Sequence, residues 1–215
     1  MRVLASLAYA ALANVGASAT TPHSADIQVR GAEDIKANIY LIRHGEKIDD
    51  DHVGLSDEGK ERAQCVKDFF SSNSYLVDYI IAQDYKPDGK RIRPYETVKP
   101  LADKLGLQVD HHCSKEDEDC VYDTIKKASK DGKRSILVCW EHSKLTDIAD
   151  KLDVNDLEYP DDRFDVVYSI KEAKVERIFS EQCPNLDSEY VGWVGTKDSK
   201  PKLVDDGSWA KGAGN

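Results

Sequence analysis

The stretch Ile39-Tyr40-Leu41-Ile42-Arg43-His44-Gly45-Glu46 decides the fold of this chain. Its unbroken apolar run, rich in β-branched residues and preceded by polar ones, is typical of a strand buried on both faces of a parallel sheet. In such sheets, ligands bind outside the carboxyl ends of the strands. Gly45 permits a sharp turn and a close approach of the backbone, which leaves the imidazole of His44 open beside the guanidinium of Arg43. This stretch therefore outlines a site for a phosphate group.

Strand and helix patterns alternate along the rest of the chain. We expect helices over residues 56–70, 94–105, 121–130 and 145–152, and strands over 79–82, 135–140, 164–170 and 175–179. Ser56 is the expected N-cap of the first helix, Gly106 the stop of the second, and Pro100 a kink within the second. The alternation predicts an α/β fold, a three-layer α/β/α sandwich with a mostly parallel central sheet.

Length and charge limit the classes of protein and partner. With 215 residues, 40% of them hydrophobic and 33% charged, the chain matches one ordinary globular domain with a sizeable core. Its net charge of -10 argues against nucleic acid or an anionic membrane surface as a partner. An acidic protein that binds phosphate must gather its arginines locally.

The N-terminal segment has the pattern of a secretory signal peptide. Arg2 supplies the positive start, residues 3–13 the apolar region, and Ala17-Ser18-Ala19 a cleavage site of small residues. The alternative is a short amphipathic helix of the domain itself, but the alanine-rich run has no polar face. We expect a signal peptide over residues 1–19, a single domain over 20–215, and an extracellular protein.

Five cysteines would then meet an oxidising compartment, and an odd count leaves at least one of them unpaired within the chain. They are Cys65, Cys113, Cys120, Cys139 and Cys183. We expect a bridge between Cys113 and Cys120, because they flank a highly charged loop with little apolar material to hold it. Cys139 lies in a predicted strand and is expected to be a small buried residue. A bridge between Cys65 and Cys183 is the other pairing considered.

The segment His111-His112-Cys113, together with Cys120, also allows a metal cluster as an alternative. Adjacent histidines point apart in an extended chain, and the spacings of tetrahedral zinc sites are absent. We therefore expect no metal here.

Three further segments follow Arg43-His44-Gly45 in order. They are Leu55-Ser56-Asp57-Glu58-Gly59-Lys60-Glu61-Arg62-Ala63, Arg93-Pro94-Tyr95-Glu96-Thr97 and Ile136-Leu137-Val138-Cys139-Trp140-Glu141-His142. Together the four resemble the histidine phosphatase superfamily, in its phosphoglycerate-mutase-like branch. There, an Arg-His-Gly signature is followed by Leu-Thr-x-x-Gly-x-x-Gln-Ala, by Arg-x-x-Gln/Glu-Thr, and by a strand that delivers a second histidine. The resemblance spans residues 36–183 and implies a phosphoglycerate-mutase-like catalytic domain.

The resemblance implies a role for each matched residue. His44 would attack phosphorus as a neutral imidazole and form a phosphohistidine, and nearby guanidiniums would disfavour its protonation. Arg43 and Arg93 would bind the phosphoryl oxygens, because a guanidinium donates two parallel hydrogen bonds. His142 would donate to an equatorial oxygen of the transition state. No cofactor or metal is needed.

The proton donor lies in a segment that varies within the family. Residues 116–119 form an acidic run, from which we select Asp117, with Glu116 and Glu141 as rivals. The alternative is a solvated charge run without a catalytic role. Crowded carboxylates raise one another's pKa, so this assignment predicts an acidic activity optimum.

Two features depart from the family pattern. Ser143 follows the second histidine where the family usually has glycine, and the loop before the second arginine is longer, with Lys86, Lys90 and Arg91 added. Arg91 is also a rival of Arg93, and the four-residue step to the threonine favours Arg93. Both departures concern substrate preference more than the core reaction.

These observations predict a secreted phosphatase that hydrolyses small phosphomonoesters. One alternative is a phosphotransferase of the phosphoglycerate mutase type. Another, from a different class, is a secreted interaction protein that keeps the fold without turnover.

Overall fold

A six-stranded sheet with four helices makes up the part of the chain that the structure, a computed structural model, describes: residues 31, 34–49, 51–72, 74–155 and 157–187. The predicted signal peptide, and the two ends of the predicted domain, lie outside these residues. Among them, no helix is long and apolar enough to cross a membrane.

The sheet is mostly parallel, as the sequence predicts. Its strands are β1 (Asn38–Arg43), β2 (Tyr79–Ala82), β3 (Val109–Asp110), β4 (Ser135–Trp140), β5 (Val166–Lys171) and β6 (Lys174–Ser180). They lie in the order β3-β2-β4-β1-β5-β6. The pairs β1 with β4, β2 with β4 and β2 with β3 are parallel, whereas β5 runs antiparallel to both β1 and β6. Strand β1, which precedes His44, is thus an inner strand of the sheet.

The helices are α1 (Asp57–Phe70), α2 (Arg93–Leu105), α3 (Glu118–Lys130) and α4 (His142–Lys151). The hydroxyl of Ser56 accepts the Gly59 amide hydrogen and caps α1, and Gly106, with φ of 66°, ends α2, as predicted. Helices α3 and α4 each begin three residues before the predicted position. The two-residue strand β3 was not predicted, because so short a segment carries no alternating pattern.

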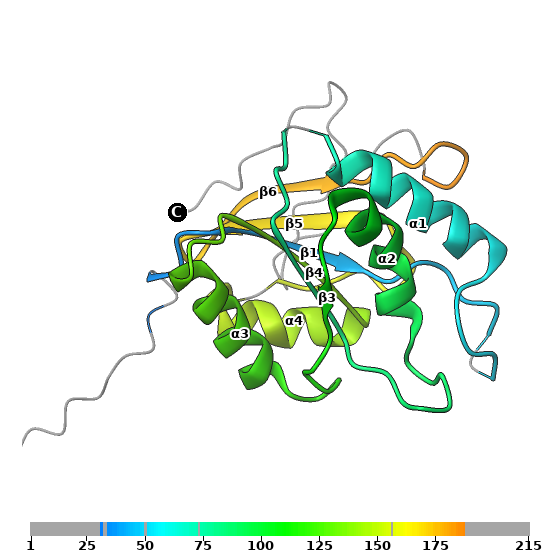
Figure 1. Cartoon of the computed structure of the whole chain (residues 1–215), viewed down its shortest axis with the longest axis horizontal. Coiled ribbons are helices and arrows are strands. Elements are labelled where there is room, and N and C mark those ends of the chain that lie inside the picture. The colour runs from blue at the N-terminus through cyan, green and yellow to red at the C-terminus, as the bar shows by residue number, and fades with distance from the viewer. Residues whose placement is uncertain (1–30, 32–33, 50, 73, 156, 188–215) are drawn as a thin grey trace, which may run out of the picture. The chain divides into compact units, whose positions relative to one another are not determined.

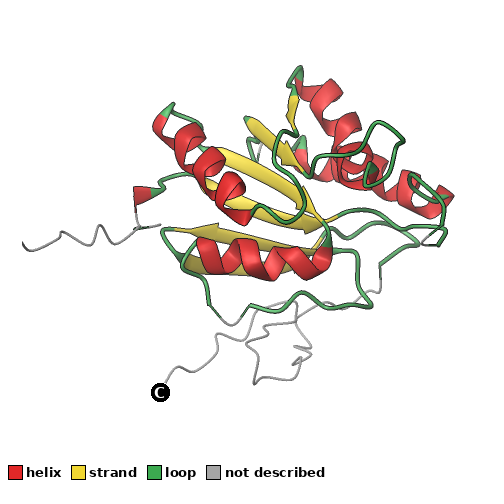
Figure 2. Cartoon of the chain, turned by 90° about the horizontal axis from the view of Figure 1, so that it is seen from below, coloured by secondary structure: helices red, strands yellow, loops and turns green. Residues whose placement is uncertain are grey.

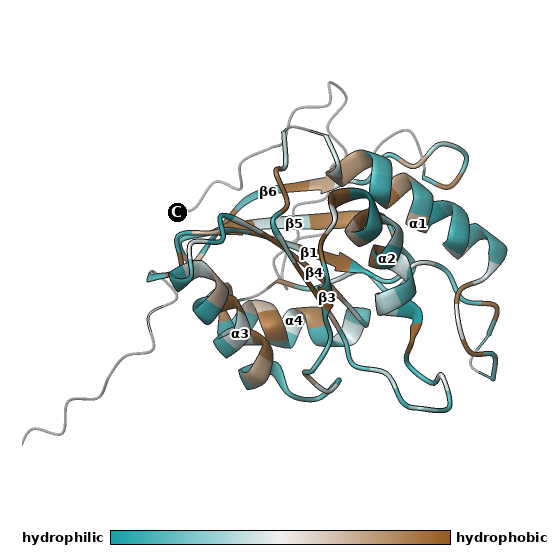
Figure 3. Cartoon of the chain, viewed as in Figure 1, coloured by the Kyte–Doolittle hydropathy of each residue, from teal (hydrophilic) through white to brown (hydrophobic). Residues whose placement is uncertain are grey.

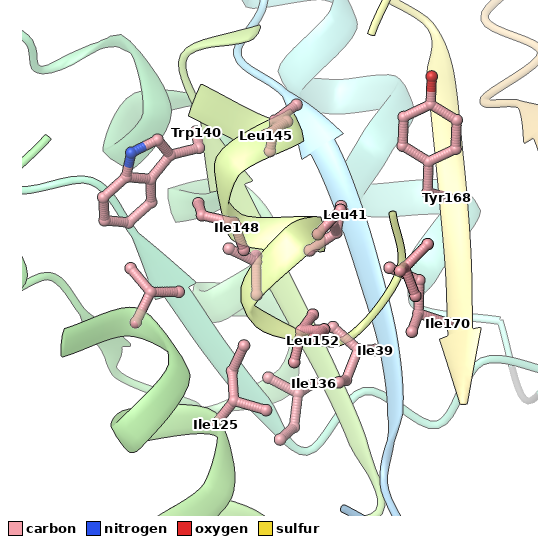
Figure 4. Close-up of a cluster of buried hydrophobic side chains, with 14 of the residues drawn as sticks. Ile39, Leu41, Ile125, Ile136, Trp140, Leu145, Ile148, Leu152, Tyr168 and Ile170 are labelled. Atoms are coloured by element: carbon pink, nitrogen blue, oxygen red, sulfur yellow. The ribbon is translucent and has the colours of Figure 1, made fainter. Parts of the chain in front are cut away.

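Helices pack on both faces of the sheet (Figures 1 and 2). The alternation along β1 assigns its residues to two cores. Ile39 and Leu41 pack with apolar residues of α3 and α4, and Tyr40 and Ile42 pack with those of α1 and α2. Figure 4 shows the first core, and Figure 3 shows hydrophobic residues concentrated on the strands and hydrophilic ones on the connecting loops. The predicted three-layer sandwich is confirmed.

Strand register brings three chain segments together at one end of the sheet. Arg43, the last residue of β1, pairs with Trp140, the last residue of β4. The backbone amide of His44 then donates to the carbonyl oxygen of Trp140 at 3.1 Å. After β2, the backbone amide of Gln83 donates to the carbonyl oxygen of Cys139 at 3.2 Å. Residues that follow β1, β2 and β4 therefore meet at the carboxyl edge, where parallel sheets bind ligands.

Four of the cysteines form two disulfide bonds. Cys113 is bonded to Cys120, as predicted, and Cys65 in α1 is bonded to Cys183 after β6, which realises the other pairing considered. Cys139 is free and buried, as expected. Because the thiols of Cys113 and Cys120 are consumed by their disulfide, they are not available as thiolate ligands beside His112.

Candidate active site

A cavity of about 460 Å³ opens at the carboxyl edge of the sheet. It is lined by Arg43, His44, Lys47, Asp51, His52, Val53, Gly54, Gln83, Lys86, Lys90, Arg91, Arg93, Pro94, Lys115, Glu141 and His142. The structure thus brings both predicted histidines and both predicted arginines to one cavity, although they are up to 99 positions apart in the sequence, from Arg43 to His142.

Arg43 is held rigidly from one side. Its Nη1 donates to the carbonyl oxygens of Asp161 at 2.7 Å and Arg163 at 2.8 Å, and its guanidinium carbon lies 3.9 Å from the centre of the Phe164 ring. Its buried Nε has no hydrogen-bond partner among the described residues. A buried donor without a partner is costly, and an anion in the cavity would satisfy it. Sequence reasoning missed this supporting segment because nothing in residues 161–164 resembles a motif.

His44 is buried, with 6% of its surface exposed, and its Nδ1 lies 2.7 Å from the carbonyl oxygen of Gly45. Burial, the largest cause, and the charges of Arg43 and Arg93 together lower the pKa of His44 to about 4, against the opposing hydrogen bond to Gly45. The imidazole is therefore neutral near pH 7. Since a carbonyl oxygen only accepts, Nδ1 carries the hydrogen, and Nε2 keeps its lone pair. Burial, the larger cause of the neutral state, could not be read from the sequence.

The turn after His44 is fixed by tight packing on α1 and α2. A side chain on Gly45 would approach the carbonyl oxygen of Gly59 to 2.9 Å, and one on Gly59 would clash with the backbone of Glu46. The Gly45 amide donates to the hydroxyl of Thr97 at 2.9 Å, and that hydroxyl donates to the carbonyl oxygen of Arg93 at 2.8 Å. The glycines and the threonine of the matched segments thus position the histidine.

Arg93 begins α2, and its guanidinium binds three backbone carbonyl groups beside the cavity. Its Nε donates to the carbonyl oxygen of Gly54 at 2.9 Å, and its Nη2 donates to the carbonyl oxygens of Asp49, at 2.9 Å, and His52. Arg91 lines the cavity as well. The charge of Arg93 contributes to the lowered pKa of His44, which favours Arg93 as the second arginine of the site.

His142 is the first residue of α4, and carboxylates lie at both of its ring nitrogens. Nδ1 lies 2.8 Å from Glu141, and Nε2 lies 3.0 Å from Asp161. Burial and the charge of Arg43 lower the pKa of His142 below its ordinary value, against the two carboxylates. The side chain of Asp161 is 92% exposed, so an incoming phosphoryl oxygen can take its place at Nε2.

The structure does not bring Asp117 into the cavity. Its carboxylate accepts the amide hydrogen of Cys120 at 3.0 Å and caps α3. Its neighbour Glu116 forms an ion pair with Lys144 at 2.9 Å, and this hydrogen bond lowers the pKa of Glu116. The sequence predicted that crowding raises the pKa of these carboxyl groups and so gives an acidic optimum. For Glu116 this prediction is wrong, because its ion pair with Lys144 lowers the pKa.

Glu141, the other rival, does line the cavity beside His142. Burial acts to raise its pKa, but a hydrogen bond from the Ser143 hydroxyl at 2.5 Å, together with the charges of His142 and Lys115, lowers it overall. The hydroxyl of Ser143 thus orients this carboxylate. Glu141 is ionised in the unliganded protein.

A buried cluster of one arginine and three carboxyl groups lies behind the turn and was not predicted from the sequence. Arg62, 2% exposed, donates to Glu46 at 2.7 Å, to Glu181 at 2.8 Å and to Asp187 at 2.7 Å. Arg62 lies on the same face of α1 as buried Gly59 and Val66, and that spacing was the available signal. Through Glu46, the cluster fixes the chain two residues after the imidazole.

Comparison with known proteins supports the fold. No family model matches the sequence, and no curated protein sequence matches it significantly. The solved structure of the protein histidine phosphatase SixA complexed with tungstate superposes with a TM-score of 0.51 and 13% identity, covering 67% of this chain and 97% of that one. The phosphoglycerate mutase from Bacillus anthracis str. Sterne gives a TM-score of 0.51 and 14% identity, over 69% and 96%. The chain therefore has a phosphoglycerate-mutase-like fold, as its sequence predicts.

Proposed function

We propose that this chain is a secreted phosphatase that hydrolyses phosphomonoesters of small molecules through a phosphohistidine on His44. The observation that carries the proposal is the protonation state of that imidazole in an arginine-lined cavity. A buried, neutral ring with its hydrogen on Nδ1 leaves Nε2 as a nucleophile. Arg43, with Nε unpartnered, supplies a charged donor for the phosphoryl oxygens next to it.

In the first step, the Nε2 lone pair of His44 attacks phosphorus, and the P–N bond forms as the ester P–O bond breaks. Arg43, Arg93 and His142 stabilise the equatorial oxygens, where charge accumulates. The leaving oxygen takes the electron pair and a proton from Glu141. Glu141 is ionised in the free protein, but a phosphate dianion bound beside it raises its pKa and favours the protonated acid.

In the second step, water attacks the phosphohistidine. Glu141, now a carboxylate, takes a proton from that water as the P–N bond breaks, and the electron pair returns to Nε2 of His44. Glu141 is protonated by this step, and it releases the proton to solvent when inorganic phosphate leaves, which restores the ionised free protein. The cycle uses only groups that line the cavity.

Two observations support secretion. Residues 1–19 have a signal-peptide pattern, and the described part of the chain contains two disulfide bonds, which persist in oxidising compartments. Expression of the full chain in a secreting host tests this. The expected product is extracellular and begins at Thr20, whereas a cell-retained product that begins at Met1 contradicts secretion.

The catalytic proposal is tested with purified protein and a panel of phosphomonoesters. We expect phosphate release and a phosphoenzyme that survives alkaline quenching, both lost in His44→Asn and kept in the control His112→Ala, which lies outside the cavity lining. If the wild type is as inert as His44→Asn and no phosphoenzyme forms, the result favours a non-catalytic interaction protein over a phosphatase. If phosphate passes to a sugar or glycerate acceptor faster than to water, the phosphotransferase replaces it.

A further inference from the structure

The mouth of the active-site cavity carries more positive charge than a single phosphoryl group requires. Besides the two arginines assigned to that group, five further cationic side chains line it: Lys47, Lys86, Lys90, Arg91 and Lys115. Among the residues that the structure describes, two carboxylates line the same cavity, those of Asp51 and Glu141. The whole chain has a net charge of -10, so this excess is local and runs against the average field of the protein.

The residues around the imidazole and the loop cations differ in how exposed their side chains are. Arg43, His44 and Gln83 are buried at the floor, with 5%, 6% and 2% of their surfaces exposed. Lys86, Lys90 and Arg91, by contrast, are exposed at the entrance. A ligand that places one phosphoryl group against His44 therefore extends towards these cations.

The loop that carries three of them is ordered by its own backbone. The amide of Lys86 donates to the carbonyl oxygen of Lys90 at 2.9 Å, and the amide of Gly89 donates to that of Lys86 at 2.9 Å. Arg91 follows with a φ of 69°, a left-handed conformation that costs a non-glycine residue free energy.

Lys90, at the entrance, forms a weak ion pair. It lies 3.6 Å from Asp88, and both side chains are more than half exposed. An exposed pair of this length contributes little, and a phosphate group competes with it readily. Lys115 is less exposed and lies 3.4 Å from Glu141. Lys144, Lys115 and Arg91 all act to lower the pKa of Glu116, so Lys115 and Arg91 act on the same part of the rim.

We propose that the substrate is a small organic compound with at least two phosphate groups, one cleaved at His44 and one bound by Lys86, Lys90 and Arg91. This inference rests on the proposed phosphatase function and names its substrate class. A volume of about 460 Å³ has room for a sugar-sized body as well as a phosphoryl group. The cations line a cavity of a strongly acidic protein, which favours a compact ligand over an acidic protein surface.

The test compares glucose 6-phosphate with glucose 1,6-bisphosphate, which differ by one phosphate group. We expect kcat/KM to be at least about 30-fold higher for the bisphosphate, because charge-assisted hydrogen bonds are the stronger kind. In the triple variant Lys86→Gln, Lys90→Gln, Arg91→Gln, this ratio should fall to near one. The control Lys126→Gln, Lys127→Gln, Lys130→Gln removes the same charge from α3, away from the cavity lining, and should keep the ratio.

Calorimetric binding of both sugars to His44→Asn gives a readout that does not depend on turnover. A bisphosphate preference that the loop variant abolishes supports binding of the second phosphate group by this loop; if the wild type then hydrolyses neither compound, the phosphatase proposal fails and the binding site remains. Equal affinities and equal kcat/KM values overturn the substrate class while phosphate release upholds the phosphatase. Faster hydrolysis of a phosphoserine peptide with acidic neighbours than of the bisphosphate also overturns the small-molecule class.

Discussion

The Nδ1 atom of His44 lies 2.7 Å from the carbonyl oxygen of Gly45, the residue that follows it in the chain. This contact commits the hydrogen of the neutral ring to the nitrogen that faces the backbone. The carbonyl group of Gly45 thus leaves Nε2 of His44 as the nitrogen that can act as a nucleophile, so the geometry of this turn determines the chemistry of the imidazole.

The pH profile of the proposed reaction should be limited on the acid side by His44. Protonation of His44 removes the nucleophile, and its pKa is lowered to about 4. We expect kcat/KM to fall tenfold per pH unit below about pH 4, provided the fold persists there. Initial rates at low substrate concentration measure this, and an acid limb with its midpoint near 6.5, the ordinary pKa of histidine, contradicts it.

A carboxyl-to-amide change at Glu141 should act selectively on poor leaving groups. Glu141→Gln cannot protonate an alkoxide, whereas p-nitrophenolate leaves without protonation. We expect kcat for an alkyl phosphate to fall about 100-fold or more, and kcat for p-nitrophenyl phosphate to change much less. Asp117→Asn is the matched control, since Asp117 caps α3 outside the cavity lining. An equal loss on both substrates would remove Glu141 from the role of acid.

Stability between pH 6.5 and 8 should depend on Glu181. Its burial raises its pKa to about 8, although Arg62 opposes the shift. With the folded pKa above the ordinary value of 4.5, its stabilising contribution is complete below pH 4.5 and is lost as the pH rises through 8.

His44 acts in the opposite sense. Its folded pKa lies below the ordinary value of 6.5, so its contribution is complete above pH 6.5 and is lost as the pH falls through about 4.

From pH 6.5 to 8, Glu181 should therefore lower the free energy of unfolding by about 1.5 kcal/mol. Urea unfolding at both values measures the decrease, which Glu181→Gln should abolish; an unchanged decrease in that variant contradicts the assignment.

The hydroxyl of Thr97 should be needed for stability, and not only the shape of the side chain. Thr97→Val keeps the volume but leaves the buried amide of Gly45 without an acceptor. We expect a loss of about 1–3 kcal/mol in the free energy of unfolding. Thr97→Ser keeps the hydroxyl and should retain most of that stability, and equal losses in the two variants would show that the methyl group matters instead.

The two disulfides should differ in what they contribute. Cys65 and Cys183 are separated by 118 residues, and Cys113 and Cys120 by 7. In the chain-entropy account, the longer closed loop stabilises the fold by about 2.5 kcal/mol more. Replacing each pair by serines and comparing the midpoints of urea unfolding tests this, with the single variant Cys139→Ser as a control for the loss of a buried sulfur. A larger loss from the short loop would favour a local role for Cys113 and Cys120.

The parts of the site that were predicted share one property: their sequence neighbours carry the signal. Arg43 and His44 follow an apolar strand, Arg93 precedes a helix with its own spacing to Thr97, and His142 follows a second apolar strand. Parallel strand order then brings such positions to one edge of the sheet, so local pattern and fold class together sufficed.

The parts that were not predicted depend on tertiary contacts. Asp117 lies between the recognisable segments and Glu141 within one of them, and only packing shows that Asp117 caps a helix while Glu141 faces the cavity. The support of Arg43 by residues 161–164 likewise joins positions about 120 residues apart. No local pattern encodes such pairs.

The bond between Cys65 and Cys183 closes a covalent ring of main chain that contains β2, β3, β4, β5 and β6. If a protease cuts once inside this ring, for example near Gly89, both fragments stay linked through sulfur. The nicked protein then migrates as one species without reductant and as two with it. For an enzyme proposed to work outside the cell, a single cut in an exposed loop need not separate His44 from His142.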